Sequence, residues 1–268
     1  MNNHLTSHRE GFENGKTTVT DRNDPTGIQF SIVRMQAGEK RVFQSDWEMA
    51  VLQMEGHGIV EVDGQKAEYR RESLFDDPPL AVHVSRDVQV MVEAVTDLEL
   101  GVFETKNDKR FASKIYLPEA TGNEHRGKGL VEDASLRYVR TIFDGSKTDP
   151  NAELVLGEVV NFPGRWSSYP PHHHPQPEIY HYRFSDERGY GHAELGDDVM
   201  KVRPYDTIRI LDENDHSQCS APGYAMYYIW VIRHLPGDRY TVPEFTKTHS
   251  WTMEPGAVGW KPREGALT

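Results

Sequence analysis

Residues 170–178, PPHHHPQPE, carry the strongest indication of fold and chemistry in this chain. Successive side chains of a β-strand point to opposite faces, so His172 and His174 leave the same face. Glu178 has the same parity and can return to that face, and His216 can complete the group from a later strand. Three imidazoles and one carboxylate suit Zn, Mn, Fe or Ni and leave coordination positions free for a substrate. The stretch therefore predicts a metal site built on β-structure, and hence an enzyme.

The simplest alternative for this stretch is a polar, proline-punctuated loop with surface histidines. The order His-x-His-x-x-x-Glu, followed about forty residues later by another His, is instead typical of cupin metal sites. In that pattern the last His follows a turn Asp by about ten residues, as His216 follows Asp206 here. His173 lies between two predicted ligands and should face away, unless a bulge breaks the alternation.

Charge and composition exclude several classes of protein. The chain has 268 residues, with 30 Lys and Arg against 42 Asp and Glu, and its net charge of −12 argues against a nucleic-acid partner. Cys219 is the only cysteine, so no internal disulfide is possible and a reducing compartment fits. Residues 1–10 lack an apolar signal region, and no run of about eighteen apolar residues exists. We therefore expect a cytoplasmic protein without a membrane partner.

Short apolar runs separated by Gly, Pro, Asp and Asn dominate the sequence, as in residues 58–62, 88–92 and 227–232. The Asp63-Gly64 pair after the first of these runs is a hairpin turn signal. Many short strands at this spacing predict an all-β sandwich or barrel. The two halves repeat the order strand, turn, strand, turn, strand, and only the second half has metal-type residues.

Several motifs resemble the 5-deoxy-glucuronate isomerases of inositol catabolism, which share a superfamily with the 5-keto-4-deoxyuronate isomerases. The run Trp166-Ser167-Ser168-Tyr169-Pro170-Pro171-His172 is specific to this family within the cupins. The other similar stretches are residues 124–128, 164–174, 178–184 and 221–224, with 71–75 and Pro78-Pro79 in the first half. The resemblance covers most of the chain.

This resemblance implies an all-β bicupin of two tandem domains. An N-terminal cupin over residues 1–125 should be structural and metal-free, in agreement with a first half that offers only His57 and His83. A C-terminal cupin over residues 126–268 should hold a divalent metal, Mn or Zn. The implied ligands are His172, His174, Glu178 and His216. Long β edges and the resemblance also favour a homo-oligomer.

The chain departs from the family pattern around the expected pocket, which indicates a divergent paralogue. An acidic insertion between the second His and the Glu is missing, and only Pro175-Gln176-Pro177 remain. Arg140 stands where a histidine is expected, and residues 212–216 replace a Pro-x-Gly-Tyr-His run. The expected activity is aldose–ketose isomerisation of an acidic six-carbon sugar, 5-deoxy-D-glucuronate first. Another C6-anionic aldose, such as 6-deoxy-6-sulfoglucose (sulfoquinovose), or a C6 phosphate, is the alternative substrate.

Isomerisation needs a base that moves a proton between C1 and C2 of a sugar whose O1 and O2 meet the metal. The candidates are His181, Glu213, Asp215 and Tyr227. His181 lies three residues past Glu178, so an uninterrupted strand turns it to the other side. Glu213 and Asp215 can equally be solvated loop carboxylates, and Tyr227 can be a core residue.

An anionic C6 group calls for arginine, which binds carboxylates in bidentate form. The candidates are Arg137, Arg140 and Arg183, and each can instead be a surface or salt-bridged residue. Two other classes of function remain open at this point. Three histidines and a glutamate also serve metal dioxygenases, and a cupin can bind sugar without catalysis.

Overall fold

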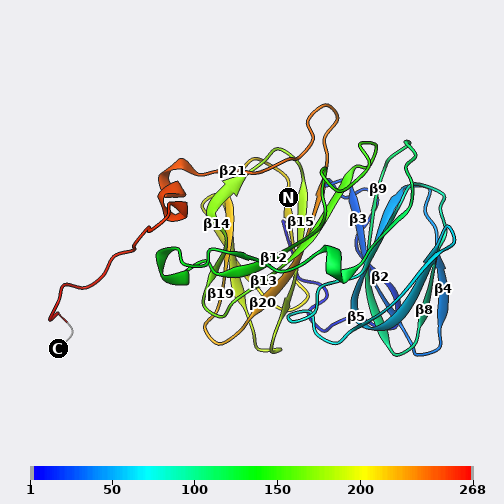
Figure 1. Cartoon of the computed structure of the whole chain (residues 1–268), viewed down its shortest axis with the longest axis horizontal. Helices are drawn as coiled ribbons and strands as arrows, with labels where there is room; N and C mark the ends of the chain where they lie inside the picture. Colours follow the sequence, from blue (N-terminus) through cyan, green and yellow to red (C-terminus); the bar gives the residue numbers. More distant parts are fainter. Residues whose placement is uncertain (1–2, 267–268) are drawn as a thin grey trace.

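The computed structural model describes residues 3–266, and these residues form an almost entirely β structure (Figure 1). The helical segments are short 3₁₀ turns: η1 (Pro118–Ala120), η2 (Val131–Asp133) and η3 (Lys247–Met253). The predicted all-β class is confirmed. None of the helices within residues 3–266 has the length and apolar character needed to cross a membrane.

The first half is a β-sandwich whose two layers are joined by one long strand. Its strands are β2 (Gly15–Thr20), β3 (Ile28–Met35), β4 (Lys40–Phe43), β5 (Glu48–Val62), β6 (Gln65–Arg71), β7 (Ala81–Val84), β8 (Val90–Ala94), β9 (Leu98–Thr105) and β10 (Lys114–Tyr116). One layer has the order β10-β7-β5-β9-β3-β2, and the end of β5 continues into the other layer with β6 and β8, beyond which lies β4. Strand β5 crosses over at Gly56, whose φ is 100° and where a Cβ would lie 2.1 Å from the Asp97 carbonyl oxygen. The predicted Asp63-Gly64 turn links β5 to β6, with both residues at positive φ as a hairpin turn requires.

The second half repeats this design with two opposed sheets. Its strands are β11 (Glu124–Arg126), β12 (Arg137–Phe143), β13 (Leu154–Asn161), β14 (Trp166–His173), β15 (Glu178–Phe184), β16 (Gly191–Leu195), β17 (Asp198–Val202), β18 (Thr207–Ile210), β19 (His216–Ser220), β20 (Met226–Arg233) and β21 (Glu244–Phe245). One sheet has the order β18-β15-β20-β13-β12-β11, and β1 (His4–Leu5) extends it beside β18. The facing sheet has the order β17-β16-β19-β14-β21.

The sheet that contains β15 and β20 has two buried faces, and this arrangement positions the site. Side chains such as Ile179 and Ile229 point outward and pack with Phe30 and Phe103 of the first half in a core between the halves. Their strand neighbours, Tyr180 among them, point inward to the core between the two sheets of the second half. Alternate residues of one strand therefore belong to different interiors.

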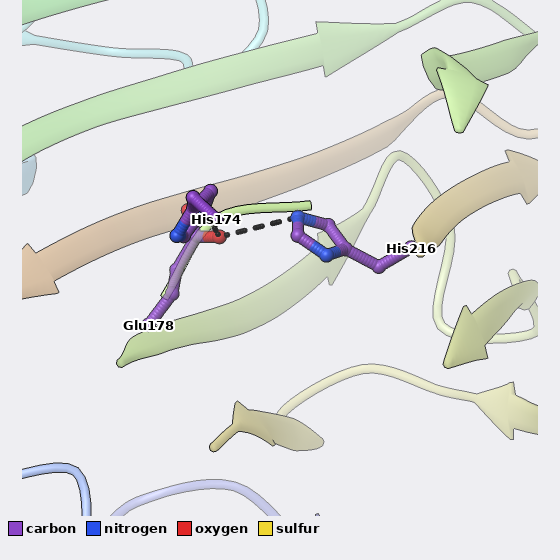
Figure 2. Close-up of side chains that lie close together, drawn as sticks. All are labelled: His174, Glu178 and His216. Carbon is purple, nitrogen blue, oxygen red and sulfur yellow. Dashed lines mark hydrogen bonds and ion pairs between the residues drawn. The ribbon is translucent and has the colours of Figure 1, made fainter. Parts of the chain in front are cut away.

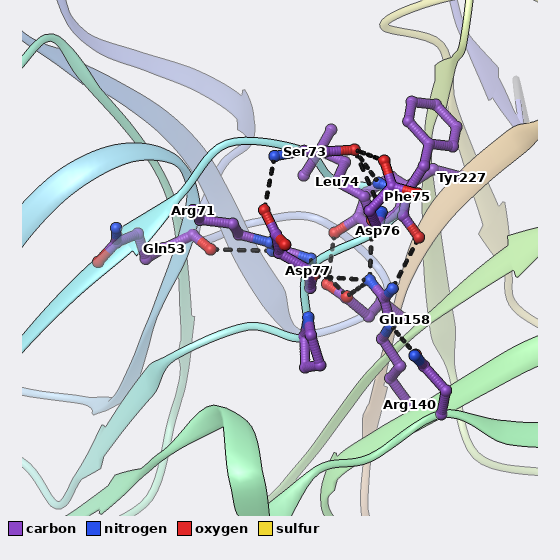
Figure 3. A network of polar contacts seen from close by, with 12 residues as sticks. Gln53, Arg71, Ser73, Leu74, Phe75, Asp76, Asp77, Arg140, Glu158 and Tyr227 are labelled. Carbon is purple, nitrogen blue, oxygen red and sulfur yellow. Dashed lines mark hydrogen bonds and ion pairs between the residues drawn. The ribbon is translucent and has the colours of Figure 1, made fainter.

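A buried polar network also joins the halves (Figure 3). The Glu158 carboxylate accepts hydrogen bonds from Arg71 at 2.5 Å, Arg140 at 2.8 Å and the Tyr227 hydroxyl at 2.7 Å. Arg140 also donates to the carbonyl oxygens of Leu74 and of neighbouring residues in the loop that follows β6. All four charged or phenolic side chains are fully buried, so their mutual contacts replace lost solvation.

The interior of the first half is filled with apolar side chains, including Val33, Met49, Val60, Val82 and Val92. Among the described residues, this filling leaves no imidazole cluster inside the sandwich, and the prediction of a metal-free first half stays a prediction. His83 instead donates to the buried Glu48 carboxylate, which also accepts the backbone N–H groups of residues 153 and 154. The predicted division between residues 125 and 126 falls inside β11, and the assignment of domains stays a prediction.

Candidate metal centre

Three of the predicted ligands converge inside the second half (Figure 2). One ligand atom from each of His174, Glu178 and His216 lies within 4.8 Å of the others, and all three residues are buried. The Nε2 atoms of His174 and His216 lie 3.2 and 3.6 Å from the same Glu178 oxygen, Oε2. Two imidazole nitrogens that face one carboxylate oxygen make an arrangement suited to a shared cation.

The local chain path explains this convergence. Strand β14 ends at His173, and a short proline-rich turn of residues 175–177 brings the chain back so that β15 begins with Glu178. Strand β19 begins with His216, which is paired in register with His172 on β14. The ladder between β14 and β19 is irregular between residues 167 and 172, close to the left-handed Ser168. The ligand residues thus sit at three adjoining strand ends.

Backbone carbonyls set the orientation of two of the imidazoles. The Nδ1–H of His174 donates to the Gln176 oxygen at 2.9 Å, and that of His216 to the Asn214 oxygen at 3.2 Å. A histidine that donates through Nδ1 keeps its Nε2 lone pair free for a metal. The His216 Nε2 is buried and has no hydrogen-bond partner within residues 3–266. This unpartnered atom fits a ligand for a cation.

His172 lies beside this group, outside the 4.8 Å cluster. Its ring centroid is 4.4 Å from that of His216 and 6.4 Å from that of His174. Its Nδ1 is buried and also lacks a hydrogen-bond partner among the described residues. Burial, and then the neighbouring His216, His174 and Arg137, lower the pKa of His172 well below its usual value. A neutral imidazole is the form that binds metals, so the protonation state of His172 suits a ligand beside the three clustered residues.

A cavity of about 230 Å³ opens next to the ligands, between the two sheets. Arg137 lies in its wall with only 7% of its surface exposed. Within residues 3–266 its side chain makes one hydrogen bond, from Nη1 to the Ser135 oxygen at 2.7 Å, and no ion pair. Burial, uncompensated by a carboxylate in contact, lowers the pKa of Arg137. A desolvated guanidinium without an acidic partner is costly and indicates an anionic ligand.

The structure places three other predicted side chains on the far face of the same sheet. Arg140 is held in the Glu158 network, with no surface left for a sugar. Arg183 donates to Glu99 at 2.8 Å and to His181. His181 also contacts the Thr207 hydroxyl at 2.8 Å and lies against the Phe30 ring, in the core between the halves. These positions contradict a direct contact of Arg140, Arg183 or His181 with a substrate beside the ligands, because each side chain points out of the second half.

Three further candidates lie away from the cavity. Tyr227 points to the first half and donates to Glu158. Glu213 is exposed on the loop before β19 and does not line the cavity. Asp215 accepts a hydrogen bond from His173 at 2.7 Å on the outer side of β14, where His173 faces away from the ligands as the strand alternation predicts. Among the described residues, none of the four proposed acid–base groups therefore reaches the cavity. Tyr227, like Arg140, points out of the second half and contacts Glu158.

Sequence reasoning missed the hydroxyl groups that do line the cavity. The Tyr228 hydroxyl lies 2.6 Å from Ser167 Oγ and 3.3 Å from Ser168 Oγ, and Ser168 also bonds to Tyr180. Burial raises the pKa of both tyrosines, so they stay protonated at neutral pH. Tyr180 lies two residues after Glu178 on β15, so strand alternation predicts that both side chains point to the same face. Tyr240 packs against the His174 ring from a loop without any periodic pattern.

Comparison with known proteins shows the family of this chain. The model of the KduI/IolB family matches residues 4–252. A 5-deoxy-glucuronate isomerase from Geobacillus thermodenitrificans is 30% identical over 200 residues, which are 66% of this chain and 67% of that protein. The crystal structure of an IolB-like protein from Salmonella typhimurium matches with a TM-score of 0.78 and 25% identity, over 91% of this chain and 97% of that one.

A cupin 2 conserved barrel domain protein from Leptotrichia buccalis matches with a TM-score of 0.50 and 11% identity, over 86% of this chain and 95% of that one, which concerns the fold alone. Together these structures confirm the predicted bicupin architecture. The relatives likewise confirm the prediction of an enzyme of the aldose–ketose isomerase class. The chain therefore belongs to the KduI/IolB family.

Proposed function

We propose that this chain is a metal-dependent aldose–ketose isomerase of an acidic six-carbon sugar, with 5-deoxy-D-glucuronate as the first choice of substrate. The observation that carries the proposal is one cavity with two opposite features. Its wall holds His174 and Glu178, whose cluster His216 completes, and also the desolvated, unpaired Arg137. A metal suits the reacting end of such a sugar, and a guanidinium suits its carboxylate.

The proposed metal ligands are His172, His174, Glu178 and His216. When bound, a divalent ion such as Mn or Zn supplies Lewis-acid stabilisation of the negative charge that develops on the sugar oxygens. The carbonyls of Gln176 and Asn214 hold two of the imidazoles in the tautomer that this role needs.

The remaining cavity side chains orient the sugar and hold protons. Arg137 binds the C6 carboxylate and so sets which end of the sugar reaches the ligands. Tyr180 and Tyr228 stay protonated and donate hydrogen bonds to sugar hydroxyls, while Ser168 bridges the two phenols. We assign to this hydroxyl chain the task of holding the proton that passes between the two sugar oxygens.

A C6 sulfonate, as in 6-deoxy-6-sulfoglucose, is the second candidate substrate. The same guanidinium recognises it, since Arg137 is unpaired and faces a cavity with room for an anion. Arg140 does not bear on this choice because its side chain lies outside the cavity.

The test is a panel of aldoses assayed for ketose formation under anaerobic conditions, after removal of bound metal and addition of Mn or Zn. The panel should include 5-deoxy-D-glucuronate, the sulfo-sugar and neutral glucose. We expect turnover of an anionic member without oxygen. Glu178→Gln should lose metal and turnover, whereas Glu213→Gln, an exposed carboxylate near the same strands, should keep both. Metal-independent turnover, or turnover that needs oxygen, would contradict the proposal.

A further inference from the structure

Asp144 brings a carboxylate into the wall of the cavity beside the proposed metal ligands. It follows the last residue of β12 and lines the cavity together with His174 and Glu178. The other charged or phenolic side chains of this wall, apart from the proposed ligands, are guanidinium groups and phenols, which enter a reaction with their protons in place. Among the described cavity residues outside the ligand set, Asp144 is therefore the group suited to accept a proton from carbon.

A bulge in β12 turns Asp144 toward the cavity. Alternate residues of this strand line the cavity from Arg137 to Thr141. The pairing of β12 with β13 then shifts register between Thr141 and Phe143, and Ile142 and Phe143 both pack into the core between the halves. One extra residue in a strand reverses the alternation that follows it. Asp144 therefore faces inward, where an unbroken strand would turn it outward, and bulges often re-aim a side chain next to an active site.

The register of the sheet places Asp144 at the end that holds the proposed ligands. A row of paired residues crosses β12, β13, β20 and β15 from Phe143 to Ile179. The next row joins the level of Asp144 to that of Glu178, because these two residues follow and precede the first row on antiparallel strands. Arg137 lies at the opposite end of β12. A sugar whose acidic group meets Arg137 therefore extends with its other end toward the ligands and Asp144.

One oxygen of the Asp144 carboxylate forms a local turn, and the other is available to a ligand. Oδ1 accepts the backbone N–H of Ser146 at 2.9 Å and its hydroxyl at 2.6 Å. Within residues 3–266, no hydrogen bond or ion pair reaches Oδ2. Burial raises the pKa of Tyr240, and the Glu178 and Asp144 carboxylates add to this effect, so the phenol lies near both. Asp144 is thus fixed through one oxygen while the other stays on the ligand side of the cavity.

We propose that Asp144 is the catalytic residue that carries the proton between C2 and C1 of the sugar, a role that rests on the proposed isomerase function. Oδ2 takes the proton from C2, the C2–H electron pair forms the C1=C2 bond, and the π pair of the C1 carbonyl moves to O1. The O2 proton passes to O1 through the hydroxyl chain of Tyr180, Ser168 and Tyr228. The C1=C2 pair then takes the proton back from Asp144 at C1, while O2 forms the new carbonyl with C2. The carboxylate ends as it began, and no further reactant is needed.

Asp144→Asn tests this role because asparagine preserves the turn. Its amide oxygen accepts the same two hydrogen bonds from Ser146, so the loop keeps its shape, but an amide does not take a proton from carbon. We expect kcat for the acidic sugar to fall about 100-fold or more, within the range of general base catalysis. Metal content and Tm should stay unchanged. The affinity for the corresponding alditol, which cannot isomerise, should stay within about threefold in calorimetry.

Asp149→Asn is a matched control in the same connection between β12 and β13. Asp149 accepts the backbone N–H of Asn151 at 2.8 Å in a turn of the same kind, but it is exposed and does not line the cavity. This variant should keep the wild-type kcat and the wild-type affinity for the alditol.

Two results would overturn the assignment of Asp144 and leave the proposed function standing. One is a kcat for Asp144→Asn within tenfold of the wild type. The other is weaker binding of the alditol at unchanged kcat, which indicates contact with a sugar hydroxyl in place of proton transfer. A wild type that forms no ketose from any aldose of the panel would overturn the proposed function itself, and the role of Asp144 with it.

Discussion

Replacement of Arg137 by methionine should separate recognition of the anion from the rest of the activity. A bidentate pair with a carboxylate contributes two charge-assisted hydrogen bonds, each worth about 1.5–3 kcal/mol. Since Arg137 is only 7% exposed and already carries a desolvation cost without its ligand, we take the lower end, about 3 kcal/mol. At 1.36 kcal/mol per tenfold change, kcat/KM for the acidic sugar should fall about 100-fold.

The same change should leave kcat/KM for a neutral aldose within about threefold, because a neutral sugar gains nothing from the guanidinium. Arg137→Lys should fall between the two, since it keeps the charge and loses the bidentate geometry. Arg126→Met, a matched change at a half-exposed arginine on the same cavity wall, should cost less than about fivefold. Equal losses for acidic and neutral sugars in Arg137→Met would refute the assignment of this residue to the anion.

The stability of the apo protein gives an independent check on the role of Arg137. Removal of a desolvated, unpaired charge should not destabilise the apo protein, so Arg137→Met should raise Tm by about 2–4 °C for a gain of about 1 kcal/mol. A lower Tm would show that Arg137 acts mainly as a structural residue.

Arg140→Met should lower the free energy of unfolding by about 3 kcal/mol, because it leaves a buried carboxylate short of a partner, while KM for every anionic sugar stays unchanged. Gly157→Ala should lower Tm and raise KM, since the new methyl would lie 2.2 Å from the Trp230 ring in the cavity wall. Chemical denaturation should show that it lowers the free energy of unfolding by about 1–3 kcal/mol. The control Gly145→Ala, which adds a methyl in open space, should change this free energy very little. His234 has a pKa lowered to about 4 by burial, below its unfolded value of 6.5, so its contribution to stability is complete above pH 6.5 and is lost as the pH falls toward 4. Unfolding of His234→Gln followed across this range should depend less on pH than that of the wild type.

The all-β class and the convergence of the ligand residues could be predicted because both depend on local rules. Strand alternation predicts that His172 and His174 leave one face, and the turn at residues 175–177 returns Glu178 to them. A hairpin signal such as Asp63-Gly64 needs only two residues. The same alternation, counted from Glu178, also turns Arg183 to the opposite face, so this candidate could have been set aside from the sequence.

The rest of the site depends on contacts between distant segments. The faces taken by Arg140 and Tyr227 follow from the pairing of β12, β13 and β20, and a shift of one residue in that register would reverse them. Tyr240 reaches the cavity because a loop returns to β14 through β21, which no periodic pattern announces. The ligand role of the histidines, the cytoplasmic location and the homo-oligomer stay predictions.

The sheet with two buried faces lets this molecule change its chemistry without loss of its architecture. Residues that face the cavity and residues that pack against the first half alternate along the same strands, so mutations in one set leave the other in place. Evolution can then vary the substrate by replacing inward side chains one at a time, while outward neighbours such as Ile179 and Ile229 continue to hold the backbone rigid. The first half is therefore a fixed support that permits divergence in its neighbour.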